Sequence, residues 1–307
     1  MIRWTVGLVL LILTVWLGVG WYVADQFLSR AIPEYDEIEE LTSLEDMGLS
    51  AIDREAVQFV SGDSVLAATF FRHPQPSDCA VILIPGIGGS RTQVLPILPL
   101  FWDLNCHVLA YDPRGTGGST RVPRSFGFFE KEDNVAALRW VSQHTGLAET
   151  SIGVWGPSFG AAVGLMTLER LPDIGFVIAD STFAAFDRVA KETIAQLSNE
   201  LVADLITPLV LTILEARTGM RVEDVAPARS IAKSTTPILL VHALNDPAMN
   251  IEHSREVYAN RTSSLVELEI TDWGAGHGDS AVVDPAKYKV LVRSFLARHQ
   301  RTKHLVQ

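Results

Sequence analysis

The sequence predicts an α/β protein with a mostly parallel central sheet, helices on both faces of that sheet and an apolar helix at the N-terminus. Short, continuous apolar runs alternate with helical patterns, which is typical of strands buried on both faces of a parallel sheet. Apolar runs at residues 56–60 and 65–71 flank a turn at 61–64 and predict an antiparallel hairpin at the start of the sheet. The pentapeptide GPSFG, at residues 156–160, lies between a short apolar run and a small-residue helical run. That context makes it a candidate nucleophile turn.

The remaining elements follow from the same patterns. Residues 91–104 can form a crossover helix, which Pro96 and Pro99 make irregular. Residues 181–234 interrupt the alternation with helical patterns only, and we expect them to form a lid over the C-terminal edge of the sheet. The middle of this lid is apolar nearly all round, which favours packing into its own small core over contact with lipid. Further strands are expected at 80–84, 108–111, 152–155, 176–179, 238–241 and 266–270, and further helices at 130–145, 252–260 and 287–299.

The N-terminal segment carries no charge from residue 4 to residue 24. As a helix it would be about 30 Å long, enough to cross the hydrocarbon core of a bilayer. An uncleaved anchor is favoured over a cleaved signal peptide, because the apolar region is long and Tyr22 and Ala24 form a poor cleavage site. Arg3 precedes the span and acidic residues follow it, so we expect a single-pass protein with a cytoplasmic N-terminus and an extracytoplasmic catalytic domain.

The predicted organisation is therefore a membrane anchor at residues 1–30, an acidic linker at 31–53 and a globular domain at 54–303. The linker contains no Lys or Arg, and we expect it to be solvated. The chain of 307 residues has a formal net charge of −11, which argues against a nucleic-acid partner.

The two cysteines, Cys79 and Cys106, each precede a strand, and those two strands are expected to be neighbours. The cysteines would then lie within disulfide reach, although two buried free thiols are the favoured prediction.

Three residues could carry nucleophilic chemistry. Ser158 would sit on a strained turn that exposes its hydroxyl. Asp246 and His277 each follow a later strand, and His277 is the histidine flanked by glycines in such a loop. The carboxyl ends of parallel strands meet at one edge of the sheet, so the three side chains are expected to converge there. Asp180, which follows the strand at 176–179, is the alternative candidate for the triad acid. Asp246 is favoured because it follows the strand that more usually carries the acid in folds with this kind of nucleophile turn.

An oxyanion hole requires two backbone N–H groups aimed at the developing charge. We expect Phe159 to supply one and Ile87, in the glycine-rich loop at 85–90, to supply the other. This loop lacks both the Lys-Ser/Thr of a P-loop and the third glycine of a dinucleotide motif, so neither a cofactor nor a metal is expected. A second glycine-rich turn, at residues 112–119, is expected to be structural.

Together these motifs resemble the α/β-hydrolase superfamily over about residues 55–300, and the Bem46-like branch of membrane-anchored serine hydrolases in particular. The resemblance implies the α/β-hydrolase fold, with Ser158 as nucleophile, His277 as base and Asp246 as orienting acid. Two positions depart from the family pattern, namely Pro85 before the oxyanion glycine and Pro157 before the nucleophile. The motifs that carry the resemblance are Gly86-Ile87-Gly88-Gly89-Ser90, the DPRG-x-G-x-S turn at 112–119, GPSFG at 156–160, Asp180-Ser181, Asn245-Asp246 and Gly276-His277.

The resulting hypothesis is a membrane-anchored serine hydrolase that acts on an ester, a thioester or a lipid acyl group of a small-molecule or lipid substrate. A serine peptidase or an acyltransferase on the same fold is the alternative within enzymes. A non-catalytic scaffold protein is the alternative outside them, and the presence of all three reactive residues counts against it.

Overall fold

The computed structural model describes residues 2–28 and 36–299. One eight-stranded sheet has the strand order β1-β2-β4-β3-β5-β6-β7-β8. The β1–β2 and β2–β4 pairs are antiparallel and all other pairs are parallel, as the apolar runs predict. The strands are β1 (Arg54–Ser61), β2 (Ser64–Phe71), β3 (Ala80–Leu83), β4 (His107–Tyr111), β5 (Ile152–Pro157), β6 (Phe176–Asp180), β7 (Ile238–Ala243) and β8 (Val266–Thr271).

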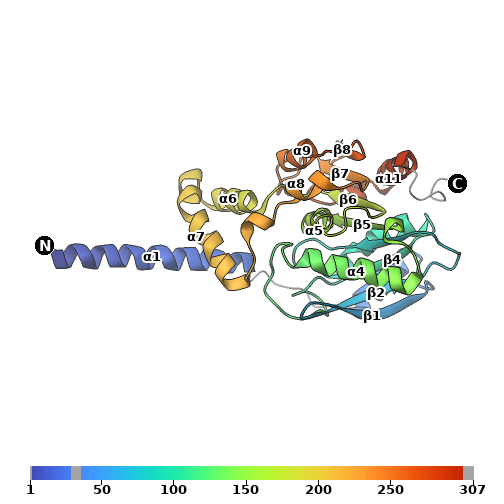
Figure 1. Cartoon of the computed structure of the whole chain (residues 1–307), viewed down its shortest axis with the longest axis horizontal. Coiled ribbons are helices and arrows are strands. Elements are labelled where there is room, and N and C mark those ends of the chain that lie inside the picture. Colours follow the sequence, from blue (N-terminus) through green and yellow to red (C-terminus); the bar gives the residue numbers. More distant parts are fainter. Residues whose placement is uncertain (1, 29–35, 300–307) are drawn as a thin grey trace.

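Helices cover both faces of this sheet (Figure 1). One face carries α4, α5, α8 and α9, and the other carries α2, α3 and α11. The expected helix at 91–104 is split into the 3₁₀ helix η1 (Arg91–Ile97) and the short α3, consistent with its prolines. The α-helices are α1 (Ile2–Leu28), α2 (Glu37–Asp46), α3 (Leu98–Trp102), α4 (Glu130–Thr145), α5 (Phe159–Thr167), α6 (Phe186–Leu197), α7 (Glu200–Thr218), α8 (Pro227–Ser230), α9 (Glu252–Ala259), α10 (Ser280–Val283) and α11 (Pro285–His299).

The acidic segment at 31–53 differs from the expected solvated linker. Its helix α2 packs on the domain, where Leu44 is fully buried. Glu40 is also buried: it accepts a hydrogen bond from Thr69 at 2.9 Å and lies 3.7 Å from the Arg91 guanidinium. The partners of Glu40 come from distant parts of the chain, so the charges of the neighbouring residues do not predict its burial. Residues 29–35 lie outside the described residues.

The segment at 181–234 is helical, as expected. Its two long helices, α6 and α7, form a hairpin beside the C-terminal part of α1. The hairpin lies at the end of the domain from which α1 extends outward (Figure 1). Ala203, Ile206, Val210 and Leu214 of α7 are buried in a cluster that also contains Ala24 of α1. The hairpin therefore packs in a cluster that it shares with α1 and with Ala162 and Met166 of α5, and among the described residues it has no core separate from the rest of the domain.

The prediction of two free cysteine thiols is wrong. Strands β3 and β4 are parallel neighbours with Ala80 opposite His107, so Cys79 and Cys106 stand side by side just before them. The structure joins them in a disulfide, with their Cα atoms 4.8 Å apart, instead of leaving two free thiols.

Candidate active site

Ser158 lies on the sharp turn between β5 and α5. Its backbone has φ 52° and ψ −114°, a region that a residue with a side chain rarely occupies. The amide of Ser158 donates to the carbonyl of Asp180 at 2.7 Å, which fixes the turn against the end of β6. The hydroxyl of Ser158 thus points away from the strand, at the carboxyl edge of the sheet.

The close crossing of β5 and α5 requires the two glycines around the serine. A Cβ at Gly160 would lie 2.2 Å from the carbonyl oxygen of Ile84, and one at Gly156 would lie 2.6 Å from the backbone of Gly160. Any side chain at these positions would force helix and strand apart. The glycines of the motif are therefore explained by backbone contact.

The three predicted side chains meet in one chain of hydrogen bonds. Nε2 of His277 lies 2.8 Å from Oγ of Ser158, and Nδ1 of His277 lies 2.8 Å from Oδ2 of Asp246. The other carboxylate oxygen of Asp246 accepts the amides of Ala248 at 2.8 Å and Met249 at 2.9 Å. In this arrangement Nδ1–H of His277 donates to Asp246, and Nε2 is left to accept the serine proton.

The electrostatics suit a carboxylate at Asp246. Burial by itself raises the pKa of Asp246, but hydrogen bonds from His277, Met249 and Ala248 outweigh burial and bring the pKa below its ordinary value. The side chain of Asp246 is 1% exposed and that of His277 is 25% exposed. A buried, ionised acid therefore lies behind a ring that is open on the serine side.

Asp180, the rival acid, has a different place. Its carboxyl accepts the hydroxyl hydrogen bond of Ser181 at 3.1 Å, and the Ser181 oxygen in turn accepts the amide of Gly278, also at 3.1 Å. Burial raises the pKa of Asp180 to about 7. These contacts hold the loop that carries His277.

His242, at the end of β7, lies beside Asp246 and is itself held by hydrogen bonds. Its Nε2 lies 3.0 Å from the carbonyl of Met249 and 3.6 Å from the Asp246 carboxylate, and its Nδ1 lies 2.7 Å from the Ser254 hydroxyl. Burial lowers the pKa of His242, which favours the neutral ring.

A cavity of about 470 Å³ opens over Ser158 and His277, and Gly86, Ile87 and Phe159 line it too. Phe159 is the first residue of α5, so its amide has no acceptor within the helix. The backbone groups chosen for an oxyanion hole therefore border the same space as the serine hydroxyl.

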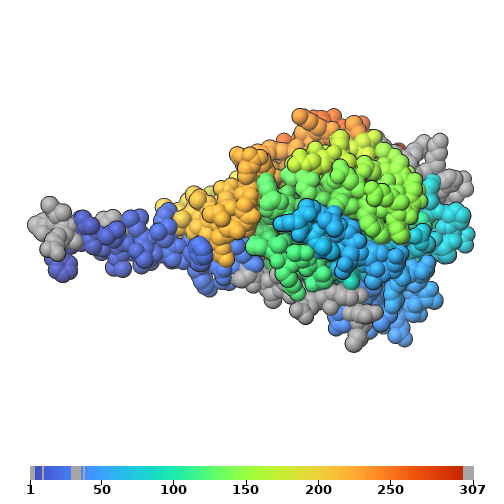
Figure 2. All heavy atoms as spheres, turned by 60° about the horizontal axis from the view of Figure 1, so that its bottom comes forward, coloured from blue at the N-terminus to red at the C-terminus, as the bar shows by residue number. Residues whose placement is uncertain are grey.

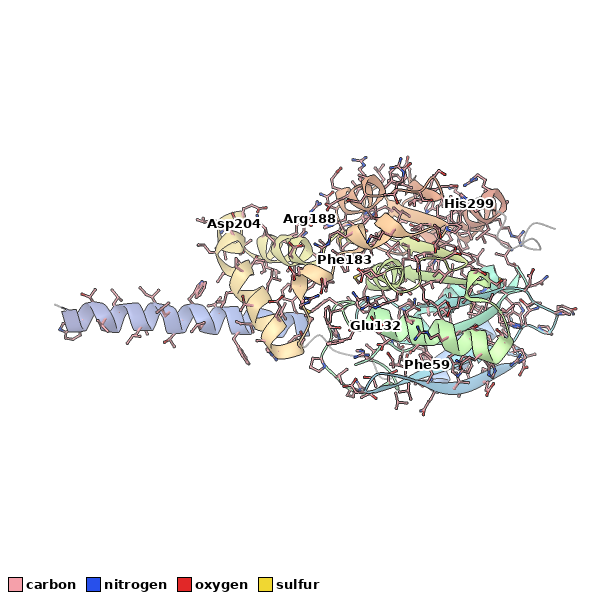
Figure 3. All side chains as sticks on the ribbon, viewed as in Figure 1. Phe59, Glu132, Phe183, Arg188, Asp204 and His299 are labelled. Atoms are coloured by element: carbon pink, nitrogen blue, oxygen red, sulfur yellow. A yellow bond between two sulfur atoms is a disulfide. The ribbon has the colours of Figure 1, made fainter. Side chains whose placement is uncertain are left out.

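Aromatic side chains form apolar walls of the cavity, which Gln93, Thr193 and Gln196 also line. Phe126, Phe183 and Phe186 come from the loop before α4, the loop after β6 and the start of α6, and Phe27 comes from α1. Figure 3 shows Phe183 where the α6–α7 hairpin meets the rest of the domain. No local pattern predicts Phe27 in this cavity, because a long apolar N-terminal run indicates only an anchor.

The second glycine-rich turn is structural, as expected. Asp112 accepts the amides of Arg91 at 2.7 Å and Gly118 at 2.8 Å. A Cβ at Gly117, where φ is +48°, would lie 2.1 Å from the Asp112 carboxylate, so the turn closes tightly on that side chain.

This fold and the placement of the serine turn define an α/β hydrolase. Residues 80–217 match the family described as alpha/beta hydrolase fold. The chain is also 30% identical to the uncharacterized protein YqkD of Bacillus subtilis over 237 residues, 73% of each chain. The protein therefore belongs to the α/β-hydrolase superfamily.

Two further similarities agree with this assignment. Protein bem46 of Schizosaccharomyces pombe is 33% identical over 99 residues, which is 32% of each chain. The esterase Pf2001 of Pyrococcus furiosus superposes with a TM-score of 0.67 and 22% identity, covering 88% of this chain and 98% of that one. The second likeness establishes the fold alone.

Proposed function

We propose that this protein is a serine hydrolase that cleaves an ester, thioester or lipid acyl bond, with Ser158 as nucleophile, His277 as base and Asp246 as orienting acid. The observation that carries the proposal is the pair of 2.8 Å hydrogen bonds that link the three side chains, two of which, Ser158 and His277, line the cavity. Relatives named as a thiohydrolase and as a polyketide transferase support acyl chemistry on this sequence pattern.

The mechanism follows from the geometry. His277 accepts the Ser158 proton at Nε2 while the serine oxygen attacks the acyl carbon. The amides of Ile87 and Phe159 stabilise the negative oxygen, and the leaving group departs with the proton from His277. Water then attacks the acyl-enzyme, His277 accepts its proton, and the acid product and Ser158 are released.

The walls of the cavity support an apolar acyl group. A volume of about 470 Å³ between phenylalanine rings accommodates a hydrocarbon chain, and no cofactor is needed for the reaction. The helices of residues 181–234 act as a lid in this proposal, since α6 contributes Phe186 and Val189 to the cavity.

We further propose a single-pass protein with the catalytic domain outside the cytoplasm. The helix from Trp4 to Leu28 is long and apolar enough to cross a membrane. Arg3 precedes it, and acidic residues follow it. The Cys79–Cys106 disulfide supports the same orientation, because disulfides persist in oxidising compartments.

Acyl transfer is the second candidate, because the same acyl-enzyme can be captured by an alcohol or a thiol and a relative is named as a polyketide transferase. The two activities differ in whether the acyl-enzyme reacts with an acceptor or with water. A transferase forms the transfer product even when the acceptor is dilute in water, whereas a hydrolase releases the free acid.

The test is labelling of the full chain, in detergent, with a fluorophosphonate probe beside the Ser158→Ala variant. We expect the wild type to be labelled and the variant to be unlabelled, because the probe reacts only with an activated serine. Ser263→Ala, in the loop before β8 at the opposite edge of the sheet, is the control and should still be labelled. A folded wild type that takes no label in the presence of lipid vesicles would instead favour the scaffold interpretation.

A further inference from the structure

The anchor helix α1 forms part of the active-site cavity. Phe27, near the C-terminal end of α1, lines the cavity that contains Ser158. Its ring packs edge-on against Phe186 and Phe126, with centroid distances of 6.1 Å and 6.2 Å. Membrane anchoring alone does not require a side chain of α1 to line the cavity over Ser158.

Three contacts hold α1 firmly to α7. Asp25 and Arg217 form an ion pair at 3.0 Å, and the Arg217 guanidinium also lies 4.7 Å from the centre of the Trp21 ring. At Gly20 the helices approach so closely that a Cβ would lie 2.3 Å from Leu209. Since α1 and α7 are joined in this way, the direction of α1 in a membrane also sets the orientation of the α6–α7 hairpin.

The α6–α7 hairpin exposes three leucines, which we call the hairpin face. Leu197 ends α6, and Leu201 and Leu205 lie one turn apart on α7, with exposed fractions of 82%, 70% and 61%. Figures 1 and 2 show the hairpin at the end of the domain from which α1 projects. Exposed leucines clustered at one end of a domain mark an interaction surface.

The hairpin lies against the apolar part of α1. Ile206, next to Leu205, borders a groove whose other walls are Leu11, Ile12, Val15, Trp16 and Val19. Those α1 side chains lie in the span that a bilayer would cover. The hairpin is therefore continuous with the membrane-facing surface of α1.

One ion pair lies beside the hairpin face. Asp204, labelled in Figure 3 near the free end of the hairpin, forms an ion pair with Lys191 at 2.6 Å, and both side chains are about half exposed. Pairing lowers the cost of bringing these charges close to the acyl chains.

We propose that the α6–α7 hairpin rests in the bilayer leaflet that α1 enters, and that the acyl chain of a lipid substrate passes from this leaflet along α1 and past Phe27 to Ser158. The entry route rests on the proposed hydrolase function, whereas the bilayer contact does not. The sequence favoured packing over lipid contact for this segment, and the proposal assigns packing to the buried side of α7 and lipid contact to the hairpin face.

A fluorescence measurement tests the bilayer contact without relying on catalysis. The protein carries two cysteines, which are joined to each other, so a single label can be placed through Leu201→Cys. The full chain with bimane at this position is reconstituted into phosphatidylcholine vesicles with and without brominated acyl chains. We expect strong quenching by the brominated lipid, and no quenching for Val290→Cys, an exposed control on α11.

Two outcomes would overturn the bilayer contact. One is quenching at position 201 no greater than at position 290. The other is protection of position 201 from both lipid and aqueous quenchers in a dimeric protein, which would mean that a second copy covers the hairpin face.

A rate measurement tests the entry route. We compare hydrolysis of 4-nitrophenyl palmitate held in phosphatidylcholine vesicles with hydrolysis of soluble 4-nitrophenyl butyrate. Leu201→Ser combined with Leu205→Ser should lower the vesicle rate about tenfold, because two leucines lose their apolar contact, and the soluble rate should stay within about twofold. The matched control pair is Val60→Ser with Val290→Ser, which replaces exposed apolar residues on β1 and α11.

The outcomes separate the two proposals. An equal vesicle rate in the leucine variant, despite quenching at position 201, would overturn the entry route. A wild type that hydrolyses neither ester would overturn the hydrolase function, and with it the route, while the quenching result would still decide the bilayer contact.

Discussion

Two residues at the carboxyl edge of the sheet hold backbone conformations that disfavour side chains. Ser158 has φ 52° and Ser181, just after β6, has φ 54°. The amide of Ser158 bonds to the Asp180 carbonyl, and the Ser181 hydroxyl links the Asp180 carboxyl to the loop of His277. Strain at these neighbouring strand ends is therefore held by hydrogen bonds that also position nucleophile and base.

The two candidate acids should differ sharply in their effect on activity. Asp246→Asn removes the charge that holds His277 in the correct tautomer, and we expect kcat to fall by about a thousandfold or more. Asp180→Asn leaves that contact intact and should lower kcat by less than about tenfold. Steady-state hydrolysis of a soluble ester measures both, and a larger loss in the Asp180 variant would reverse the assignment of the acid.

Asp180 should also make stability depend on pH. Burial raises its pKa in the folded protein to about 7, against an ordinary value of 3.8. Between these values the unfolded chain releases the proton and the folded protein keeps it, so stability is lost as pH rises through this window. Relative to Asp180→Asn, the free energy of unfolding of the wild type should fall by roughly 4 kcal/mol between pH 4 and pH 8. Urea denaturation of both proteins at the two pH values measures this change, and a constant difference would contradict the raised pKa.

At the scale of elements, the site depends on how closely α5 crosses β5 and the end of β3. The helix follows the strand directly and its first turn lies over the backbone at Ile84 and Pro85. This approach brings the start of α5 and the loop with Ile87 to the same cavity. The distance between two backbones, more than any side chain, sets the shape of the proposed oxyanion hole.

Gly160→Ala should disrupt that crossing. Its Cβ would meet the Ile84 carbonyl at 2.2 Å, and because the obstacle is backbone, relief requires moving α5. We expect a loss of on the order of 3 kcal/mol in the free energy of unfolding, together with loss of probe labelling.

Gly164→Ala, one turn further along α5, is the matched control. There the added carbon would lie 3.1 Å from a side-chain methyl of Val154, which can shift. Urea denaturation should place this variant within about 1 kcal/mol of the wild type. Equal losses in the two variants would refute the specific role of the backbone contact.

At the scale of the whole molecule, α1 is both an apolar span and a wall of the active site. The described part of α1 runs outward from the domain as a single helix, while its C-terminal part packs on α7 (Figure 1). The cavity over Ser158 and the apolar span therefore share one helix. In the proposed membrane orientation, this arrangement places the cavity within reach of a bilayer.

The disulfide should contribute to the stability of the folded domain. It closes a loop with a sequence separation of 27 residues between the starts of β3 and β4. Replacing both cysteines with alanine should lower the free energy of unfolding by about 3–4 kcal/mol, chiefly by freeing the unfolded chain. Urea denaturation measures this loss, and a thiol count on denatured, unreduced protein should find none. Two free thiols would disprove the bridge.

Local patterns predict the strands and most helices because each apolar run is buried by the element that it forms. The acid-rich stretch before β1 shows where such reasoning fails. Glu40 is buried because Thr69 and Arg91 reach it from elsewhere in the fold, and a local charge count reads the same residue as solvated. Contacts between distant segments have no local signature.

The sequence alone determined the fold class, the strand–turn–helix around Ser158 and the order in which the nucleophile, acid and base candidates follow their strands. These are properties of short segments and of strand order. The tertiary structure alone decided that His277 bonds to Asp246 and not to Asp180, that the cysteines are bridged, and that Phe27 of the apolar helix enters the cavity. The physical reason is that each of these depends on distances between residues far apart in the chain, and those distances are set only when the sheet, the hairpin and α1 pack together.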